Sequence, residues 1–273
     1  MGKSKLGQNF LRDRGAIARI AAAAGELAGR TVVEIGPGRG AITHALLERV
    51  RAANEVARDG AGLVCVELDR ELAAALRVGF LVSAPEVSVV EGSILDFDFE
   101  RAAVQAGEKL VVVGNLPYYI TSDILLHLAA HHAAIERAVL MVQREVAERV
   151  VAEPGGREYG LLSATVQLYG PVEKLFSLPP EAFSPPPEVH STVFRWRMEP
   201  RFGELGVDAE KFIGFLKMCF AQKRKTLANN LKAAGIGGAL TIEAMESAGV
   251  DARAPAETIP IEKFAGIYQA LQR

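Results

Sequence analysis

The sequence predicts a doubly wound α/β sheet followed by a small helical domain, and three observations support this fold class. From residue 31 to about residue 198, short β-branched runs alternate with longer segments of helical periodicity, as in a sheet with crossover helices. The first run ends in a turn with Gly36, Gly38 and Gly40, which leads into a helical pattern. After residue 206, apolar residues recur at helical spacing.

The strands of the first domain are predicted from runs of Val, Ile and Leu. In chain order they are 31–35, 63–67, 87–91, 110–113 and 138–142, with further strands at 172–178 and 191–198. Helices are expected between the first five. The proline-rich stretch 179–187 is predicted to be an ordered loop that joins the last two strands. The first domain is therefore expected to span residues 1–198.

A polar stretch separates this domain from the remainder of the chain. Residues 199–206 contain Pro200, Gly203 and Gly206, so they are predicted to be a linker. In the second domain, residues 207–273, aromatic and aliphatic residues from Phe212 to Phe220 predict a helix that runs on through basic residues and stops at the glycines of 235–238. Shorter helices are expected at 242–247 and 261–271, which leaves this domain too small to carry chemistry alone.

Size and composition bound the class of protein. With 273 residues, of which 49% are hydrophobic, the chain can form one large core and a smaller appendage. Its apolar stretches are strand-sized, and the segment 1–5 lacks the apolar run of a signal peptide, so a cytoplasmic protein is expected. Cys65 and Cys219 have no metal-ligand or redox spacing and are predicted to be core residues.

The charge distribution is uneven although the formal net charge is only −2. Basic residues form two clusters with few acidic residues between their members. They are Lys3, Lys5, Arg12, Arg14 and Arg19 near the start, and Lys223, Arg224, Lys225 and Lys232 in the second domain. Such clusters are often only solvated faces. Counterion release depends on local charge, so phosphate contacts remain open, above all for Lys223, Arg224 and Lys225.

The glycine turn after the first strand predicts a nucleotide-type ligand. Glycines at such a turn let a ligand approach the backbone at the start of a helix. Glu67, at the end of the next predicted strand, is expected to accept both ribose hydroxyl groups of a nucleoside. NAD and S-adenosylmethionine fit this pattern equally, and the flanking Glu34 and Pro37 favour the methyl donor.

The tetrapeptide Asn115, Leu116, Pro117 and Tyr118 favours methylation of an amine. It lies where the fourth strand ends, and ligands of open α/β sheets bind outside the carboxyl ends of strands. The Asn115 side-chain oxygen and the Leu116 carbonyl are predicted to accept hydrogen bonds from an adenine N6 amine, with Pro117 shaping the turn and Tyr118 stacking on the base. A plain Asn-Pro loop with a packed tyrosine is the alternative.

Three longer motifs resemble the ribosomal RNA adenine dimethyltransferase family over nearly the whole chain. The opening motif is Lys5 to Leu11 (KLGQNFL), the proline-rich motif is Ala182 to Ser191 (AFSPPPEVHS), and the motif in the second domain is Phe220 to Leu231 (FAQKRKTLANNL). The resemblance implies a Rossmann-like, S-adenosylmethionine-dependent enzyme. It would transfer two methyl groups to N6 of each of two adjacent adenosines in the 3′-terminal hairpin loop of small-subunit (16S) rRNA, without a metal.

The resemblance also implies site residues. The donor would be bound by Asn9, Leu11, Gly36, Gly38, Glu67, Ser93 and Asn115, and Phe183 would stack on the target adenine opposite Tyr118. The family usually has an aspartate where this chain has Ser93. Because a neutral acceptor is weaker than a carboxylate, weaker donor binding is expected rather than loss of activity. The flipped adenosine would enter from an rRNA loop, and the small second domain favours a monomer.

Three rival functions stay open at this stage. A relative that methylates large-subunit rRNA shares the first domain's motifs, and the motif at 220–231 argues against it. A ribosome-assembly factor that binds RNA without catalysis is kept open by Ser93. An NAD-dependent oxidoreductase is disfavoured because no general acid or base accompanies the glycine turn. His127 and His131 stand four residues apart, but without a nearby carboxylate a helix surface is favoured over a metal site.

Overall fold

The computed structural model describes residues 9–57, 60–223 and 225–272. The contacts divide the chain into two compact units. The sheet unit comprises Met1–Ala147 with Val172–Met198, and the helical unit comprises Glu148–Pro171 with Glu199–Arg273. Each unit has its own cluster of buried hydrophobic side chains.

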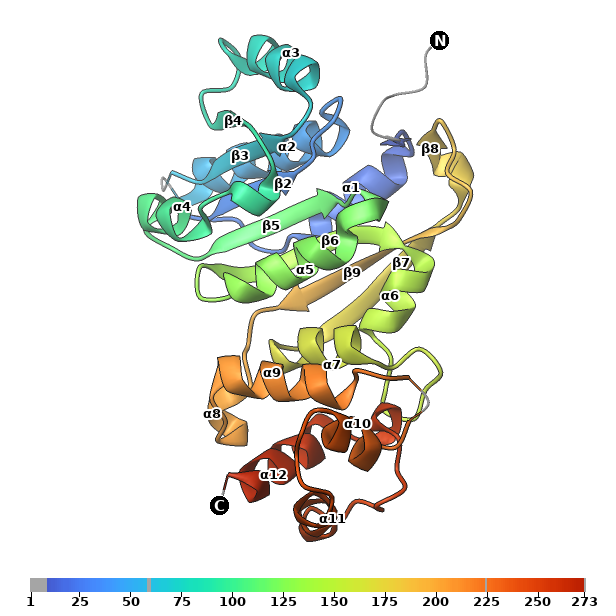
Figure 1. Cartoon of the computed structure of the whole chain (residues 1–273). Helices are drawn as coiled ribbons and strands as arrows, with labels where there is room; N and C mark the ends of the chain where they lie inside the picture. Colours follow the sequence, from blue (N-terminus) through green and yellow to red (C-terminus); the bar gives the residue numbers. More distant parts are fainter. Residues whose placement is uncertain (1–8, 58–59, 224, 273) are drawn as a thin grey trace. The chain divides into compact units, whose positions relative to one another are not determined.

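The sheet unit is built on a seven-stranded sheet with the strand order β4-β3-β2-β5-β6-β9-β7 (Figure 1). The strands are β2 (Thr31–Ile35), β3 (Gly62–Glu67), β4 (Val87–Glu91), β5 (Leu110–Asn115), β6 (Ile135–Gln143), β7 (Val172–Leu178) and β9 (Ser191–Arg197). The first five are parallel, whereas β9 is antiparallel to both β6 and β7. All seven predicted strands are confirmed, with ends that differ by up to three residues.

Helices cover both faces of this sheet, with α2 on one face and α5 on the other (Figure 1). They are α1 (Arg14–Ala23), α2 (Ala41–Ala57), α3 (Arg70–Phe80), α4 (Phe99–Ala106), α5 (Thr121–Ala130) and the short α6 (Arg144–Val150). Local capping sets several starts: Asp69 accepts hydrogen bonds from the N–H groups of Glu71 and Leu72 at α3, and Asp98 caps α4. Because both faces are covered, strands such as β5 are hydrophobic and buried almost throughout.

The order of the strands places a switch point at the carboxyl ends of β2 and β5. From β2 the chain proceeds outward through β3 to β4, then returns to place β5 on the other side of β2. Crossovers therefore leave in opposite directions at this point, and the connections cannot fill the space between the two strand ends. Open α/β sheets bind ligands there.

A two-residue ribbon was missed by the sequence prediction. β1 (Phe10–Leu11) pairs antiparallel with β8 (Phe183–Ser184). β8 follows the 3-10 turn η3 (Pro180–Ala182) within the stretch predicted as an ordered loop. Strands of two residues lack a readable period, so only the tertiary structure reveals this pairing.

The helical unit contains α7 (Leu161–Leu168), α8 (Phe202–Leu205), α9 (Ala209–Cys219), α10 (Leu227–Ala233), α11 (Gly238–Ser247) and α12 (Ile261–Leu271). Its bounds differ from the prediction, which assigned 148–171 to the first domain. Tyr159 and Leu168 from that segment belong to the buried cluster of the helical unit. The predicted linker 199–206 contains α8, and Arg201 within it forms ion pairs with Glu204 and Glu262.

The predicted helix from 212 to 235 is wrong, because the structure has two helices there. α9 ends at Cys219, and Thr226 starts α10 by accepting a hydrogen bond from the Asn229 N–H group. From α10, the Asn230 side chain donates hydrogen bonds to the carbonyl oxygens of Cys219 at 2.7 Å and Gln222 at 3.2 Å. These bonds satisfy carbonyl groups at the end of α9 and just after it, in the segment that also contains Lys223. Within the described ranges, no helix has the length and hydrophobicity needed to cross a membrane.

Candidate active site

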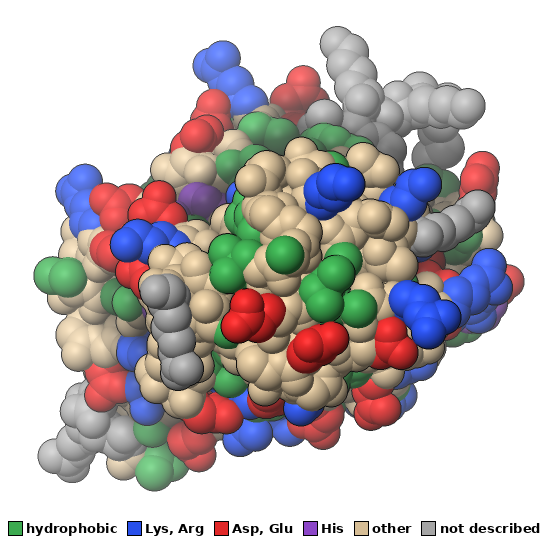
Figure 2. All heavy atoms as spheres, turned by 60° about the horizontal axis from the view of Figure 1, so that its bottom comes forward, with side chains coloured by type: hydrophobic (Ala, Val, Ile, Leu, Met, Phe, Trp, Pro, Cys, Tyr) green, Lys and Arg blue, Asp and Glu red, His purple; other side chains and the backbone are tan. Residues whose placement is uncertain are grey.

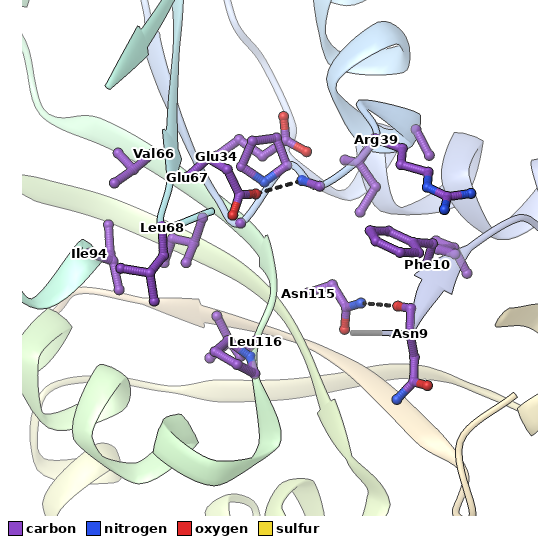
Figure 3. A pocket seen from close by; sticks show the side chains of 18 of the residues that line it. Asn9, Phe10, Glu34, Arg39, Val66, Glu67, Leu68, Ile94, Asn115 and Leu116 are labelled. Atoms are coloured by element: carbon purple, nitrogen blue, oxygen red, sulfur yellow. Dashed lines mark hydrogen bonds between the residues drawn. The ribbon is translucent and has the colours of Figure 1, made fainter. Parts of the chain in front are cut away.

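A cavity of about 520 Å³ lies at the predicted edge of the sheet (Figure 3). Its walls come from residues 9–12, the turn after β2, the ends of β3 and β4, and the tetrapeptide after β5. Four of these segments lie at the carboxyl ends of parallel strands. The cavity therefore forms where the switch point predicts it.

The glycine turn after β2 has the conformation that its sequence predicts. Gly36 and Gly38 have φ values of +61° and +58°, in the left-handed region that favours glycine. Gly36 is exposed toward the cavity. A Cβ atom on Gly38 would stand 3.0 Å from the Phe10 ring. The second glycine thus makes room for an aromatic side chain as well as for the turn.

Glu67 is fixed at the end of β3 by backbone groups. Its side chain is 3% exposed; one carboxylate oxygen accepts from the Gly38 N–H group at 2.9 Å and the other from the Asp69 N–H group at 2.9 Å. Figure 3 shows the bond to the glycine turn. Each oxygen keeps lone pairs, so the carboxylate can still accept from two hydroxyl groups of a ligand.

Glu34 is a second carboxyl group in the cavity wall, and it is 1% exposed. The Cys65 thiol donates to one of its oxygens at 3.7 Å, which is a weak contact. Burial, the largest cause, raises the pKa of Glu34 to about 7, and the polar side chains of Thr43 and Cys65 beside it oppose the shift. The sequence singled out Glu34 through its neighbourhood to the glycine turn but gave no indication of this perturbed pKa.

Asn115 ends β5 with one half of its amide engaged. Its Nδ2 donates to the Asn9 carbonyl at 3.3 Å. Its Oδ1 is buried and finds no hydrogen-bond partner among the described residues. The preceding Gly114 lets the strand end pack tightly, since a Cβ there would stand 2.9 Å from the Ile35 Cβ. A buried carbonyl oxygen without a donor is costly, and at the wall of a cavity it indicates a ligand that supplies the donor.

The tetrapeptide leads into a short 3-10 turn, η2 (Tyr118–Ile120), which precedes α5 and has Pro117 as its N-cap. Leu116 is buried, and Thr121 donates to the Pro117 carbonyl at 3.0 Å. The Tyr118 hydroxyl is 3.1 Å from the Ser191 hydroxyl oxygen, and burial raises the pKa of Tyr118. Tyr118 lines the cavity half-buried, whereas Tyr119 is 61% exposed.

Most of the predicted site residues meet at this cavity. Its lining contains Asn9, Leu11, Gly36, Gly38, Glu67, Ser93, Asn115, Leu116, Pro117 and Tyr118. The Ser93 hydroxyl accepts from the Leu95 N–H group at 3.1 Å, because Ser93 caps the 3-10 turn η1 (Ile94–Asp96). Its acceptor capacity is therefore partly used by its own turn.

Phe183 does not line the cavity with these residues. It is 1% exposed and belongs to the buried cluster of the sheet unit, while its neighbour Ser184 reaches the cavity wall. A base can reach the Phe183 ring only after the side chains around it move, so its stacking role stays a prediction. Lys223 and Lys225 are exposed in the α9–α10 loop of the helical unit, and Arg224, like residues 5–8 of the opening motif, lies outside the described residues.

Sequence reasoning missed several residues of the wall. Phe10, Arg39, Leu68, Ile94 and Ile120 line the cavity. Leu68 is 50% exposed and offers a hydrophobic contact to a ligand in the cavity. Their position in the sequence could have indicated two of them, because Arg39 follows the predicted Gly38 and Leu68 follows the predicted Glu67. Across the described ranges, no group of three or more His, Cys, Asp or Glu side chains is placed to hold a metal ion.

The family model for ribosomal RNA adenine dimethylases matches residues 1–273, which is the whole chain. The chain belongs to this family. A relative from Acidobacterium capsulatum, named ribosomal RNA small subunit methyltransferase A, is 57% identical over 99% of this chain and 91% of its own length. The resemblance found in the three sequence motifs is thereby confirmed.

Solved structures agree on the fold. The 23S rRNA methyltransferase ErmE is 27% identical, with a TM-score of 0.71 over 97% of this chain and 100% of that chain. A dimethyladenosine transferase from Plasmodium falciparum is 23% identical, with a TM-score of 0.77 over 94% of this chain and 95% of that chain. The Rossmann-like fold of S-adenosylmethionine-dependent methyltransferases is confirmed for this family member.

Proposed function

We propose that this family member dimethylates N6 of two adjacent adenosines in the 3′-terminal hairpin loop of small-subunit (16S) rRNA, with S-adenosylmethionine as donor, during small-subunit maturation. One observation carries the proposal: Asn115 lines the cavity, and its buried Oδ1 has no donor among the described residues. The amine of an adenine is the type of donor that this oxygen lacks. The name of the 57% identical relative supports the small-subunit substrate.

The cavity residues fit the proposed donor. The exposed backbone at Gly36 allows close approach, and the fixed Glu67 carboxylate has lone pairs left for ribose hydroxyl groups. Leu68 and Ile94 supply apolar surface for a flat ring. When bound, the donor supplies a methyl group made electrophilic by its sulfonium. Asn9, Leu11 and Ser93 complete the proposed donor site.

The proposed catalysis is mainly positioning. Asn115 Oδ1 and the Leu116 carbonyl accept hydrogen bonds from the N6 amine, which turns its lone pair toward the methyl group, and Tyr118 stacks on the ring. The new N–CH₃ bond forms as the S–CH₃ bond breaks, and N6 then releases one proton. A monomethylated amine still has one hydrogen, so during a second transfer it donates to one of these two acceptors. No metal is required for this chemistry.

The proposed RNA contacts of the helical unit depend on local charge. On the face drawn in Figure 2, acidic and basic side chains are intermingled. No uniformly basic surface marks an RNA-binding site on this face. The hydrogen bonds of Asn230 hold the α9–α10 loop in place, where Lys223 and Lys225 are exposed. We assign Lys223, Arg224 and Lys225 to phosphate contacts, residues 207–273 to RNA binding, and a cytoplasmic monomer as the acting species.

The deciding experiment uses radiolabelled S-adenosylmethionine with unmethylated small ribosomal subunits, followed by digestion and identification of labelled nucleosides. We expect label in N6,N6-dimethyladenosine near the 3′ end of the small-subunit rRNA, and loss of that label in Asn115→Ala. Label only in large-subunit rRNA would assign the activity to the large subunit. Donor and RNA binding without label on either RNA would indicate a binding factor.

A further inference from the structure

Arg39 presents a guanidinium group at the cavity wall that the donor site does not use. Its Cζ lies 4.5 Å from the centroid of the Phe10 ring (Figure 3), and the side chain is exposed. Stacking on an aromatic ring uses the flat face of the guanidinium. Its N–H groups, which point outward in the plane, stay available for an anion.

The Phe10 ring is a fixed platform. It fits against Gly38, where no Cβ could stand without a contact of 3.0 Å to the ring. Its backbone pairs with Ser184 in the β1–β8 ribbon. The preceding Asn9 carbonyl accepts from Asn115. Arg39 therefore contacts Phe10, and the residue before Phe10, Asn9, is hydrogen-bonded to the side-chain amide of Asn115.

Arg12 supplies a second guanidinium group to the cavity lining. Arg12 follows Phe10 by two residues and is exposed. Its Nε donates to the Glu181 carbonyl at 3.2 Å, which orients the group. Among the described residues, neither Arg12 nor Arg39 forms an ion pair with a carboxylate, whereas Arg77 and Arg195 do.

Carboxyl groups and guanidinium groups thus lie on different walls of the cavity. Glu34 and Glu67 lie behind the glycine turn at the ends of β2 and β3. The two guanidinium groups lie on the wall of residues 9–12 and Arg39. Carboxyl groups suit the hydroxyl and ammonium groups of a ligand. Guanidinium groups suit phosphates, because each guanidinium can offer two parallel N–H donors to a phosphate.

We infer that Arg39, stacked on Phe10, and Arg12 bind the phosphate groups that flank the adenosine entering the cavity. This inference rests on the proposed function, because it takes RNA as the substrate. A nucleotide inserted into the site brings a phosphate on either side of its ribose. Two guanidinium groups without carboxylate partners provide one donor set for each.

The test measures the affinity of the full chain for a 3′-terminal small-subunit rRNA hairpin at several salt concentrations. In Arg39→Gln we expect about tenfold weaker binding, as for loss of one charge-assisted contact. The slope of log K against log salt should fall in magnitude by about 0.7 to 0.9, as for one lost phosphate contact. Affinity for S-adenosylhomocysteine should stay within about twofold of wild type.

Two further variants separate a specific contact from general charge. Arg101→Gln removes the same charge from an exposed position on α4 outside the cavity, and its slope should match wild type. Arg39→Lys keeps the charge but loses the stacked fork, so intermediate binding is expected.

Weaker S-adenosylhomocysteine binding with an unchanged RNA slope would overturn the inference and assign Arg39 to the donor carboxylate. Equal slope changes in Arg39→Gln and Arg101→Gln would overturn it too, because charge alone would then explain the loss. Failure of the wild-type chain to methylate small subunits would count against the proposed function, while the salt slope would still decide the role of Arg39 in RNA binding.

Discussion

Asn115 in the sheet unit and Asn230 in the helical unit have similar local chemistry but different surroundings. Each donates through Nδ2 to backbone carbonyl oxygens, and each has a buried Oδ1 without a partner among the described residues. Asn115 lines the cavity, whereas Asn230 is 2% exposed between a helix end and a loop. An unsatisfied oxygen indicates a ligand only where there is space for one.

The largest expected effect is on methyl transfer, and it should follow replacement of Asn115 but not of Asn230. In Asn115→Ala, methyl transfer should fall about 100- to 1000-fold, since one preoriented polar contact to the reacting group is lost. The thermal midpoint should stay the same or rise, because a costly buried oxygen is removed. Single-turnover methylation and thermal unfolding measure the two quantities.

Asn230→Ala serves as the matched control for that experiment. It removes the same side chain from a site outside the cavity. If both variants lost methylation to the same extent at saturating RNA, Asn115 would have no special catalytic role.

The next effect concerns Glu34, another buried polar group of the cavity wall. Because burial raises its pKa to about 7, the folded state holds the proton at pH values where the unfolded state has released it. Its contribution to stability is fully present below about pH 4.5 and is lost as pH rises through about 7. The loss amounts to about 3 kcal/mol.

Glu34→Gln removes this pH dependence, since glutamine does not ionise. Urea unfolding between pH 5 and 8, followed by the fluorescence of the single tryptophan, Trp196, reports on the sheet unit. Relative to wild type, the variant should gain stability as pH rises. A constant difference across that range would show that Glu34 does not titrate there.

A smaller effect is expected from Asn230→Ala on stability. Losing its two hydrogen bonds leaves the Cys219 and Gln222 carbonyl oxygens without these donors. We expect the free energy of unfolding of the helical unit to fall by about 1 to 3 kcal/mol, measured by circular dichroism in urea. Asn229→Ala, whose side chain is exposed, should change it by less than about 0.5 kcal/mol.

The smallest effect tests a cavity group that already has a partner. Ser93 uses its hydroxyl to cap its own turn; an aspartate there can cap with one oxygen and accept from a ligand amine with the other. Ser93→Asp should bind S-adenosylhomocysteine about fivefold more tightly, since charge-assisted hydrogen bonds are stronger. Calorimetric titration measures the affinity. Equal or weaker binding would show that the ligand amine does not meet this residue.

The sequence predicted much of the fold because the sheet follows from local patterns. Buried parallel strands require continuous apolar runs, and the runs at 31–35 and 87–91 matched their strands at both ends. The helix 212–235 failed because apolar spacing continues past Cys219, and only the side-chain bonds of Asn230 reveal the break. The segment 148–171 was assigned to the wrong unit because hydrophobic spacing shows that a helix is buried but not which core buries it.

The sequence by itself determined the fold class, the family and most of the proposed site residues. The glycine turn and the strand-end tetrapeptide act through local backbone geometry, and the longer motifs carry the family resemblance. The tertiary structure alone decided which polar groups lack partners, and it revealed the Phe10–Arg39 stack and the burial of Phe183. These features depend on contacts between segments far apart in the chain: Asn9 meets Asn115, and β1 meets β8. Such contacts leave no periodic pattern, so no local pattern in the sequence reveals them.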